Sequence, residues 1–427
     1  MSQAQFSPPS GLINVTMEVP GSKSVANRAL VCAMLAEGTS HIRGLPDGDD
    51  TEVVLKVLRE MSVLTSLKEG CHIVGNPHAV LPGIVDSQLA GTSSRFLTAV
   101  AALSDTVTVI DGAEPLRSRP MRDLHDALVQ LGAVVDPLGE PGHLPVSISG
   151  GGLTGGTITM KADVSSQFIS ALMLIAPYLS GGLIIELEGA QVSGSYISMT
   201  ARVMTEFGVP VVITGRTIEV PEMRYQACRY VVEPDFSSAA FPIVAVLLRG
   251  GQVRIRDLGL AMHQGDSAIL EVAQKMGATW SLEGDDIVVK CSSQAQVPLL
   301  SLAMADCSDL VPVVAVAMTQ CVAKGSIHEV GFIRNKESDR LGDVASELVH
   351  IGAIVEVAED GLIFEGCPEI TGATLMTHHD HRLAMSFALL SLVEPSISID
   401  SPEVVSKSWP SYFTDMADIL GSLQIEK

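Results

Sequence analysis

Aromatic residues, basic residues and long apolar runs are all scarce in this chain of 427 residues. The 27 lysines and arginines face 49 acidic residues, and the net charge of −22 argues against binding to nucleic acid or anionic lipid. The longest strongly apolar runs, such as FISALMLIAPYL, fall short of the roughly 20 residues of a membrane-spanning helix. We therefore expect neither nucleic acid nor a membrane among the partners of this protein.

Signals for export and for disulfide bonds are missing as well. The first residues, MSQAQFSPPSGL, have neither the basic segment nor the apolar core of a secretory signal. The seven cysteines form no CxxC pair, which favours free thiols over disulfides or a zinc site. We expect a cytoplasmic protein. With 47% hydrophobic residues, its length is enough for two or three domains with separate cores.

A repeat runs through the whole chain. Six helical patterns close on a small residue just before a β-type segment, and the separations between these residues are 70, 76, 69, 75 and 69. Even spacing of this kind is typical of repeated structural modules. The six residues are Ser62, Gly132, Gly208, Gly277, Gly352 and Gly421.

Each period also holds a second helix that is apolar nearly all round, as in ALVCAMLAEG and VPVVAVAMTQC. Such a helix should be buried, whereas the other helix of each period, for example SAILEVAQKM, is amphipathic and should be partly exposed. The pattern predicts an α/β protein of six modules, each with one inner helix, one outer helix and several strands.

Six modules can form one solenoid or two groups of three. The segment GLINVTMEVP precedes the first inner helix without a module of its own. We favour two lobes of three modules, with residues 22–234 in the first and residues 1–21 and 235–427 in the second. The chain would cross between the lobes near residues 20–22 and 233–235.

Positive charges collect at the predicted helix starts. Ser, Thr and Asp at these starts are explained by N-capping, but a cation there opposes the helix dipole. Helix N-termini with adjacent cations bind anions, because backbone amides and fixed charges point to one place. The alternative is that the cations pair with nearby acids. If the modules direct these ends into a shared cleft, the ligands should be polyanions such as phosphorylated carboxylates. Ten of the 27 basic residues are involved: Lys23, Arg28, Arg95, Arg117, Arg119, Arg334, Lys336, Arg340, Arg382 and Lys407.

Two acids stand among these cations as candidates for proton transfer. If RNKESDRL is helical, Lys336 and Arg340 share one face and Glu337 lies beside both. A carboxylate in that setting is ionised when the site is empty, and it can take up a proton when bound phosphate changes the field. Asp309, which opens the buried helix in DCSDLVPVV, could remove a hydroxyl proton. Ordinary ion pairing is the alternative for Glu337, and N-capping is the alternative for Asp309.

Two further motifs carry weaker signals. The sequence HHDHR, residues 378–382, has three histidines but no HxxxH or HExxH spacing, so we rank metal binding low. The small-residue turn AGT, residues 90–92, would let backbone amides approach an anion.

Taken in order, the motifs PGSKSVANRA, AGT, RSRP, SSQF, KESDRL, DHR and the lysine of VSKSWPSYF resemble the EPSP synthase (3-phosphoshikimate 1-carboxyvinyltransferase) family. The resemblance covers essentially the whole chain. It implies an inside-out α/β barrel fold of two lobes, each built of three βαβαββ units with buried inner helices. It also implies addition and elimination chemistry that joins phosphoenolpyruvate to the 5-hydroxyl of shikimate 3-phosphate and releases inorganic phosphate. The resemblance implies no metal and no organic cofactor, and we expect a monomer.

The resemblance also implies roles for single residues. Asp309 would accept the proton of the attacking hydroxyl, Glu337 would protonate the methylene carbon, and Lys23 would assist catalysis. Shikimate 3-phosphate would be bound by Lys23, Ser24, Arg28, Ser165, Ser166, Gln167, Ser193, Asp309 and Lys336. Phosphoenolpyruvate would be bound by Lys23, Gly91, Arg119, Gln167, Arg340, Arg382 and Lys407.

The chain departs from the common family pattern at four places. Leu89 stands where many members have asparagine, Phe96 where proline is frequent, Phe332 where a substrate-contacting asparagine can occur, and Gly194-Ser195 where Lys-Pro follows the serine. The charged set is intact, but these changes bear on substrate affinity and on sensitivity to the herbicide glyphosate.

Two rival functions have testable sequence signatures. A UDP-N-acetylglucosamine enolpyruvyl transferase shares the fold and typically uses a loop cysteine, yet no cysteine lies between Cys71 and Cys228. A non-catalytic anion-binding homologue should lack the acid or the base, yet Asp309 and Glu337 are both present.

Overall fold

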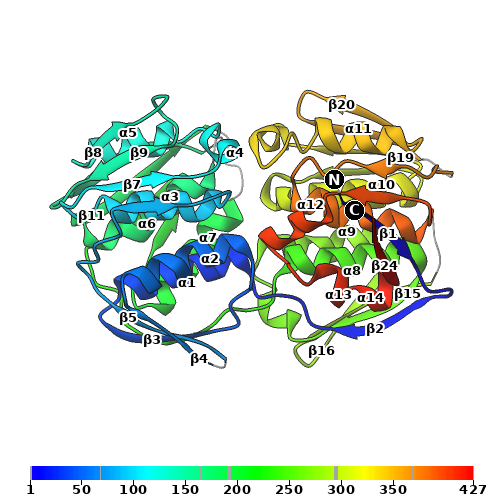
Figure 1. Cartoon of the computed structure of the whole chain (residues 1–427), viewed down its shortest axis with the longest axis horizontal. Coiled ribbons are helices and arrows are strands. Elements are labelled where there is room, and N and C mark those ends of the chain that lie inside the picture. The colour runs from blue at the N-terminus through cyan, green and yellow to red at the C-terminus, as the bar shows by residue number, and fades with distance from the viewer. Residues whose placement is uncertain are drawn as a thin grey trace. The chain divides into compact units, whose positions relative to one another are not determined.

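The chain divides into two compact units. Gly21–Val232 forms the first, which we call the contiguous unit, and Met1–Pro20 with Glu233–Lys427 forms the second, the split unit. The computed structural model describes residues 2–67, 69–162, 165–189, 194–292, 297–366 and 369–426 (Figure 1). Ser193, one of the predicted substrate-binding residues, lies outside the described residues.

Within the described residues, six four-stranded sheets share one topology, in which two neighbouring strands are parallel and the other pairings are antiparallel. Three sheets are each built from a single stretch of chain. In spatial order they are β6 (Ile84–Asp86), β7 (Thr108–Asp111), β9 (Val146–Ser149) and β8 (Val134–Pro137); β10 (Thr154–Lys161), β11 (Ser180–Glu188), β13 (Thr217–Val220) and β12 (Val212–Thr214); and β18 (Leu300–Ala303), β19 (Lys324–His328), β21 (Gly361–Glu365) and β20 (Ile354–Ala358).

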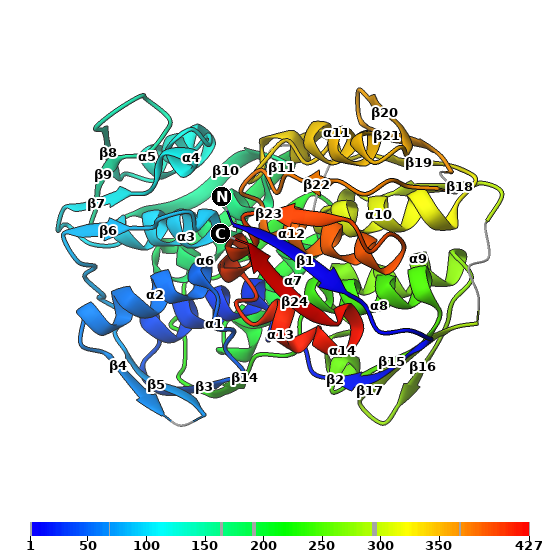
Figure 2. The same cartoon turned by 45° about the vertical axis from the view of Figure 1, so that its right-hand side comes forward.

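Each of the other three sheets takes one strand from a distant stretch of the same unit. In the contiguous unit this strand is β14 (Arg229–Val231), which joins β3 (Gly38–Arg43), β5 (Gly70–Gly75) and β4 (Leu64–Leu67). In the split unit, β2 (Ile13–Met17) joins β15 (Gly251–Ile255), β17 (Asp286–Cys291) and β16 (Thr279–Glu283). There, β1 (Gln3–Ser7) also joins β22 (Thr374–Leu375), β23 (Ser398–Asp400) and β24 (Ser422–Glu426), and Figure 2 shows β1 and β24 side by side. The segment GLINVTMEVP, which lacked a module, thus completes one sheet through β2, and the preceding strand β1 completes another.

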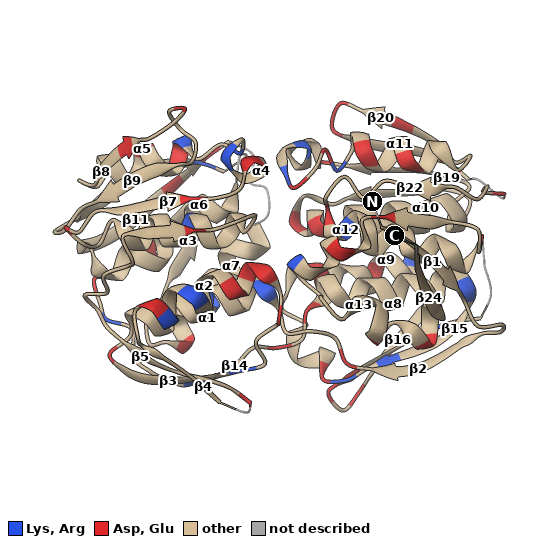
Figure 3. Ribbon diagram, viewed as in Figure 1, with Lys and Arg blue, Asp and Glu red and all other residues tan. Residues whose placement is uncertain are grey.

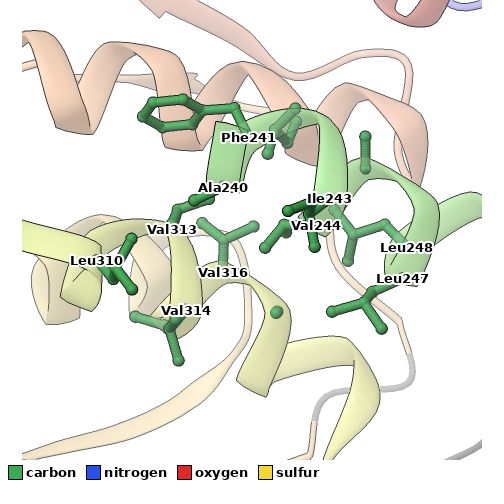
Figure 4. Packing of buried hydrophobic residues seen from close by; sticks show 14 of the residues in the cluster. Ala240, Phe241, Ile243, Val244, Leu247, Leu248, Leu310, Val313, Val314 and Val316 are labelled. Carbon is green, nitrogen blue, oxygen red and sulfur yellow. The ribbon is translucent and has the colours of Figure 1, made fainter. Parts of the chain in front are cut away.

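The six predicted inner helices are confirmed, and their side chains are buried on almost every face. In the split unit, Ala240 and Val244 of one inner helix pack beside Val313 and Val316 of another (Figure 4). Burial of such aliphatic surface stabilises each unit by about 25 cal/mol per Å². The helices are α1 (Lys23–Leu35), α3 (Gly91–Ala101) and α6 (Ser166–Ile175) in the contiguous unit, and α8 (Phe236–Arg249), α10 (Val311–Cys321) and α12 (His381–Ala388) in the split unit.

The outer helices are amphipathic, as predicted. Figure 3 shows acidic and basic positions along α2 and acidic positions along α11, whereas the inner helix α10 has neither. The outer helices are α2 (Asp49–Glu60), α5 (Arg122–Gln130), α7 (Gly194–Glu206), α9 (Ile269–Lys275), α11 (Gly342–His350) and α14 (Ala417–Leu420). Short helices and 3₁₀ turns complete the chain: α4 (Glu114–Arg117), α13 (Tyr412–Asp415), η1 (Ala176–Tyr178), η2 (Leu258–Ala261), η3 (Gly265–Ala268), η4 (Ala305–Leu310), η5 (Gly331–Asn335), η6 (Leu389–Leu392) and η7 (Pro402–Lys407).

The six small residues of the repeat all have positive φ angles and follow the last turn of an outer helix. The φ angle is 60° at Ser62 and between 77° and 103° at the five glycines. A left-handed residue just past a helix ends it and redirects the chain, and glycine adopts that conformation without strain. The even spacing in the sequence therefore marks one repeated backbone turn between outer helix and strand.

Candidate functional site

In the contiguous unit, the first turns of α1, α3 and α6 lie close together. Arg28 of α1 donates from Nη2 to Ser170 Oγ of α6 at 3.1 Å. Arg95 of α3 donates from Nη1 to Gln167 Oε1 of α6 at 2.6 Å. Since these residues belong to the first two turns of their helices, the N-terminal ends of the three helices lie close together. Polar groups and helix dipoles therefore converge in one region of this unit.

Arg28 is a buried cation with neutral partners. Its side chain is only 1% exposed, and it donates to Thr200 Oγ1 at 2.7 Å, to the Ser24 carbonyl at 2.7 Å and to the Tyr196 carbonyl at 3.5 Å. Among the described residues, no carboxylate forms an ion pair with Arg28. Burial lowers the pKa of Arg28 from 12.5 to about 10. Burying a guanidinium without a carboxylate partner is energetically unfavourable, and an anionic ligand would relieve that cost.

Lys23 has an acidic neighbour that the sequence did not reveal. Its Nζ lies 2.9 Å from Oδ2 of Asp50, a buried residue in the first turn of α2. Ser93 of α3 donates to the Asp50 carbonyl at 2.7 Å and ties α2 to the inner helices. The alternative explanation, that a cation at a helix start pairs with a nearby acid, thus applies to Lys23 but not to Arg28.

Gly91, the first residue of α3, lies between two arginines. A Cβ atom at Gly91 would be 2.7 Å from the Nη1 atoms of both Arg95 and Arg119. The missing side chain therefore leaves room for two guanidinium groups at a helix N-terminus. Ser165 is the N-cap of α6 and accepts from the Gln167 amide at 3.3 Å, while Ser166 is buried in its first turn.

In the split unit, the N-terminal ends of α8, α10 and α12 meet in the same way. Arg382, in the first turn of α12, donates to Ser237 Oγ of α8 at 3.3 Å and to Asp309 Oδ2 at 3.0 Å. Asp309 lies in η4, directly before α10. It also accepts from Arg340 Nη1 at 2.9 Å and from Lys336 Nζ at 3.5 Å. Burial alone would raise the pKa of Asp309, but the three cations hold this pKa well below its usual 3.8.

Glu337 bridges Arg340 and one further cation, Lys407. Its Oε2 accepts from Arg340 Nη2 at 2.9 Å, and its Oε1 accepts from Lys407 Nζ at 3.0 Å. The buried Arg340 also forms a two-point contact with Asp380, at 2.7 Å from Nε and 3.3 Å from Nη2. Burial lowers the pKa of Arg340, but Asp380, Glu337 and Asp309 outweigh it and raise this pKa above 12.5. Arg340 thus joins both candidate proton carriers.

The expectation that RNKESDRL is helical is wrong. Its first residues end η5, and α11 begins only at Gly342, where Asp339 Oδ1 accepts from the amides of Leu341 and Gly342 at 3.2 and 3.0 Å. Lys336 and Arg340 therefore share no helix face. They come together because both donate to Asp309.

The claim that ten cations lie at helix starts is also wrong in part. Lys407 ends the 3₁₀ turn η7, and Arg334 lies within η5. Arg117 ends the short helix α4 and pairs with Asp111 at 2.8 Å. Lys23, Arg28, Arg95 and Arg382 do lie in the first two turns of inner helices.

His378 and His379 of HHDHR lie in the loop before α12, and His381 is the first residue of that helix. His378 Nε2 lies 3.0 Å from Glu347 Oε1, and His378 and His379 have φ angles of 49° and 58°. This left-handed loop leads to Asp380, the N-cap of α12, whose carboxylate accepts from the Arg382 amide at 2.8 Å. Within the described residues, no group of three or more His, Cys, Asp or Glu side chains is arranged to hold a metal ion.

Comparison with known proteins identifies the family. The model of the family described as EPSP synthase (3-phosphoshikimate 1-carboxyvinyltransferase) matches residues 9–416. The chain belongs to the EPSP synthase family. It is 38% identical over 413 residues to the 3-phosphoshikimate 1-carboxyvinyltransferase of Methanothermobacter thermautotrophicus, and 36% identical over 417 residues to that of Nostoc punctiforme. Each alignment covers 96% of this chain and 97% of the relative.

The comparison with solved structures gives the same family. The EPSP synthase of Acinetobacter baumannii matches with a TM-score of 0.82 and 26% identity, over 100% of both chains. The α/β fold of six repeated units expected from the resemblance is confirmed. Of the helices that the structure describes, none is both long and apolar enough to cross a membrane.

The departures from the common EPSP synthase pattern fall in different settings. Phe96 is buried, and its ring centroid lies 5.2 Å from the Arg28 guanidinium carbon, so it supports a cation of the contiguous unit. Phe332 packs against the core of the split unit. Leu89 is exposed, and Gly194-Ser195 opens α7.

Proposed function

We propose that this chain transfers the enolpyruvyl group of phosphoenolpyruvate to the 5-hydroxyl of shikimate 3-phosphate, a step in aromatic amino-acid biosynthesis. The observation that carries this proposal is the pair of carboxylates Asp309 and Glu337, joined by Arg340, in a chain that matches the EPSP synthase family over residues 9–416. A proton acceptor and a proton donor among fixed cations suit addition and elimination on an anionic enol phosphate.

In the addition step, the 5-hydroxyl oxygen bonds to C2 of phosphoenolpyruvate and its proton passes to Asp309. Glu337 supplies a proton to C3, and a tetrahedral intermediate forms. In the elimination step, C3 returns a proton to Glu337, the C–O bond to phosphate breaks, and the leaving phosphate takes up the proton that Asp309 removed from the hydroxyl. The products are 5-enolpyruvylshikimate 3-phosphate and inorganic phosphate, so atoms and charge balance without a redox partner.

The charges around Asp309 account for its reactivity. In the free protein, the low pKa of Asp309 makes it a weak base, because three cations neutralise it. A polyanionic substrate draws on the same cations, so substrate binding raises the basicity of Asp309 when it is needed. Glu337, held by Arg340 and Lys407, gains proton affinity in the same way.

Substrate binding is divided among the residues predicted above. We assign the phosphate of shikimate 3-phosphate to the buried Arg28 with Lys23 and Ser24, and its ring to the start of α6. The full set for this substrate is Lys23, Ser24, Arg28, Ser165, Ser166, Gln167, Ser193, Asp309 and Lys336. The set for phosphoenolpyruvate is Lys23, Gly91, Arg119, Gln167, Arg340, Arg382 and Lys407.

We further propose that the contiguous and split units are the two lobes of three modules each, and that the protein works as a cytoplasmic monomer. All six described cysteines have free thiols, which supports a reducing compartment. Size-exclusion chromatography with light scattering tests the monomer.

A phosphate-release assay tests the function directly. Purified protein with phosphoenolpyruvate should release phosphate when shikimate 3-phosphate is added and none when UDP-N-acetylglucosamine is added. Release with the nucleotide sugar alone would assign the chain to the sister activity. Absence of release with either acceptor, together with measurable binding of shikimate 3-phosphate, would indicate a non-catalytic homologue.

A further inference from the structure

Asp266 is a buried acid beside the site that the proposed function does not use. It lies in η3, ahead of α9, and its side chain is only 6% exposed. Its Oδ2 accepts a hydrogen bond from Ser237 Oγ. Its Oδ1 is buried and has no hydrogen-bond partner among the described residues. A buried carboxylate with an unbonded oxygen is costly, whereas a neutral carboxyl group with one is much less so.

A chain of contacts connects Asp266 to the centre of the site. Ser237, which Asp266 holds, accepts from Arg382 Nη2 at 3.3 Å. The same nitrogen donates to Asp309 Oδ2 at 3.0 Å, and Arg382 Nη1 donates to the Asp309 carbonyl at 3.2 Å. Asp266 is therefore linked through one hydroxyl to the same Arg382 nitrogen that binds Asp309.

The charged and titratable groups that face Asp266 come from three neighbouring elements. Asp309 and the Cys307 thiol lie in η4, Asp235 is the N-cap of α8, and Arg382 belongs to α12. Burial raises the pKa of Asp266 to about 7, and Asp309 and Asp235 add to this rise, while Arg382 opposes it. Near neutral pH, one cation is thus shared by two acids, of which Asp309 carries the charge.

We propose that Asp266 is a positioning residue that acts through Ser237 on Arg382, and that it acts in its protonated form. This inference rests on the proposed function, in which Arg382 binds phosphoenolpyruvate. When Asp266 loses its proton, a second carboxylate draws on Arg382, and less of the guanidinium charge is available for the substrate anion. The KM for phosphoenolpyruvate then rises above neutral pH, while kcat changes less.

Asp266→Asn is the direct test, because asparagine keeps an oxygen for Ser237 and imitates the neutral acid. Steady-state phosphate release at pH 6 to pH 9 should show a wild-type KM for phosphoenolpyruvate that rises at least about fivefold over this range. The KM of the variant should be within about twofold of the wild-type value at pH 6 and flatter above it. Taking the ratio of the two profiles removes the titration of the substrate phosphate, which both enzymes share.

Glu271→Gln is the matched control, since Glu271 is an exposed acid on the adjoining helix α9, paired with Lys275 at 2.8 Å. Its KM profile should follow the wild type. If Asp266→Asn does not fold, Ser237→Ala cuts the same link and should raise the KM for phosphoenolpyruvate at pH 6 with shikimate 3-phosphate affinity unchanged.

The outcomes separate this inference from the proposed function. Wild-type protein without phosphate release at any pH would overturn the function itself. Wild-type turnover with parallel KM profiles for the wild type and Asp266→Asn would overturn the role of Asp266 alone.

Discussion

Replacement of Arg28 by methionine tests whether the buried charge of Arg28 is needed for ligand binding or for the stability of the fold. Methionine fills much of the same space but carries no charge. The drop in the pKa of Arg28 from 12.5 to about 10 corresponds to about 3 kcal/mol at about 1.4 kcal/mol per pKa unit. Because the side chain is almost fully buried, solvent screening reduces this figure little. The empty protein thus carries an unfavourable energy of this size at neutral pH.

Two consequences can be measured. Without ligand, Arg28→Met should unfold in urea within about 2 kcal/mol of the wild type, since the lost charge offsets the lost hydrogen bonds. The hydroxyl groups left behind keep partners, because Thr200 Oγ1 lies 2.9 Å from Ser170 Oγ and 2.8 Å from the Tyr196 carbonyl, either of which can accept its proton. The affinity for shikimate 3-phosphate, measured by calorimetry, should fall on the order of 100-fold, which is about 3 kcal/mol.

Arg249→Met is the matched control. Arg249 ends α8 and also has neutral acceptors, the carbonyl groups of Leu392, Gly11 and Pro9, at 2.7, 3.2 and 3.1 Å. Its loss should reduce the free energy of unfolding and leave shikimate 3-phosphate affinity unchanged. The reasoning on Arg28 is refuted if Arg28→Met binds this ligand like the wild type, or if it loses well over 3 kcal/mol of stability without ligand.

Three further predictions concern single residues. Glu337→Gln should lower kcat by about 10²- to 10⁴-fold, because a proton donor is lost, while shikimate 3-phosphate binding stays intact. The exposed Glu365→Gln is the control, and near-normal phosphate release by Glu337→Gln would contradict the prediction. Gly91→Ala should raise the KM for phosphoenolpyruvate about tenfold, because its Cβ would crowd Arg119; an unchanged KM would show that the space is not used. The depressed pKa of Asp309 stabilises the fold above pH 3.8 and this contribution is lost below it, so urea unfolding should weaken more from pH 4 to pH 3 in the wild type than in Asp309→Asn.

The repeat could be read from the sequence because it depends on local backbone geometry. Every outer helix ends on a left-handed residue, and five of the six are glycine, so the turn leaves a mark at each period. The inner helices were equally visible, since burial on all faces demands an apolar sequence without periodicity. Both features are fixed by residues close together in the chain.

The arrangement of the site depends on contacts between distant segments, and these leave no local mark. The charge spacing of RNKESDRL is typical of a helix, but α11 begins only at Gly342, just after this segment, where Asp339 accepts from the Gly342 amide. Asp50 and Asp266 were missed because an acid in the first turn of a helix usually needs no further explanation. Only the fold brings Asp50 to Lys23 and Asp266 to Ser237.

The strand exchange in the split unit has a consequence for synthesis. A nascent chain emerging from the ribosome delivers β1 and β2 first, but their sheet partners β23 and β15 are translated only after residue 250. All three sheets of the contiguous unit, in contrast, are complete once residue 231 has emerged. We expect that unit to fold during translation while the first 20 residues are still unpaired and accessible to protease. Strand β2 must wait for β15, at residues 251–255, and β1 must wait for β23 and β24 in the last third of the protein.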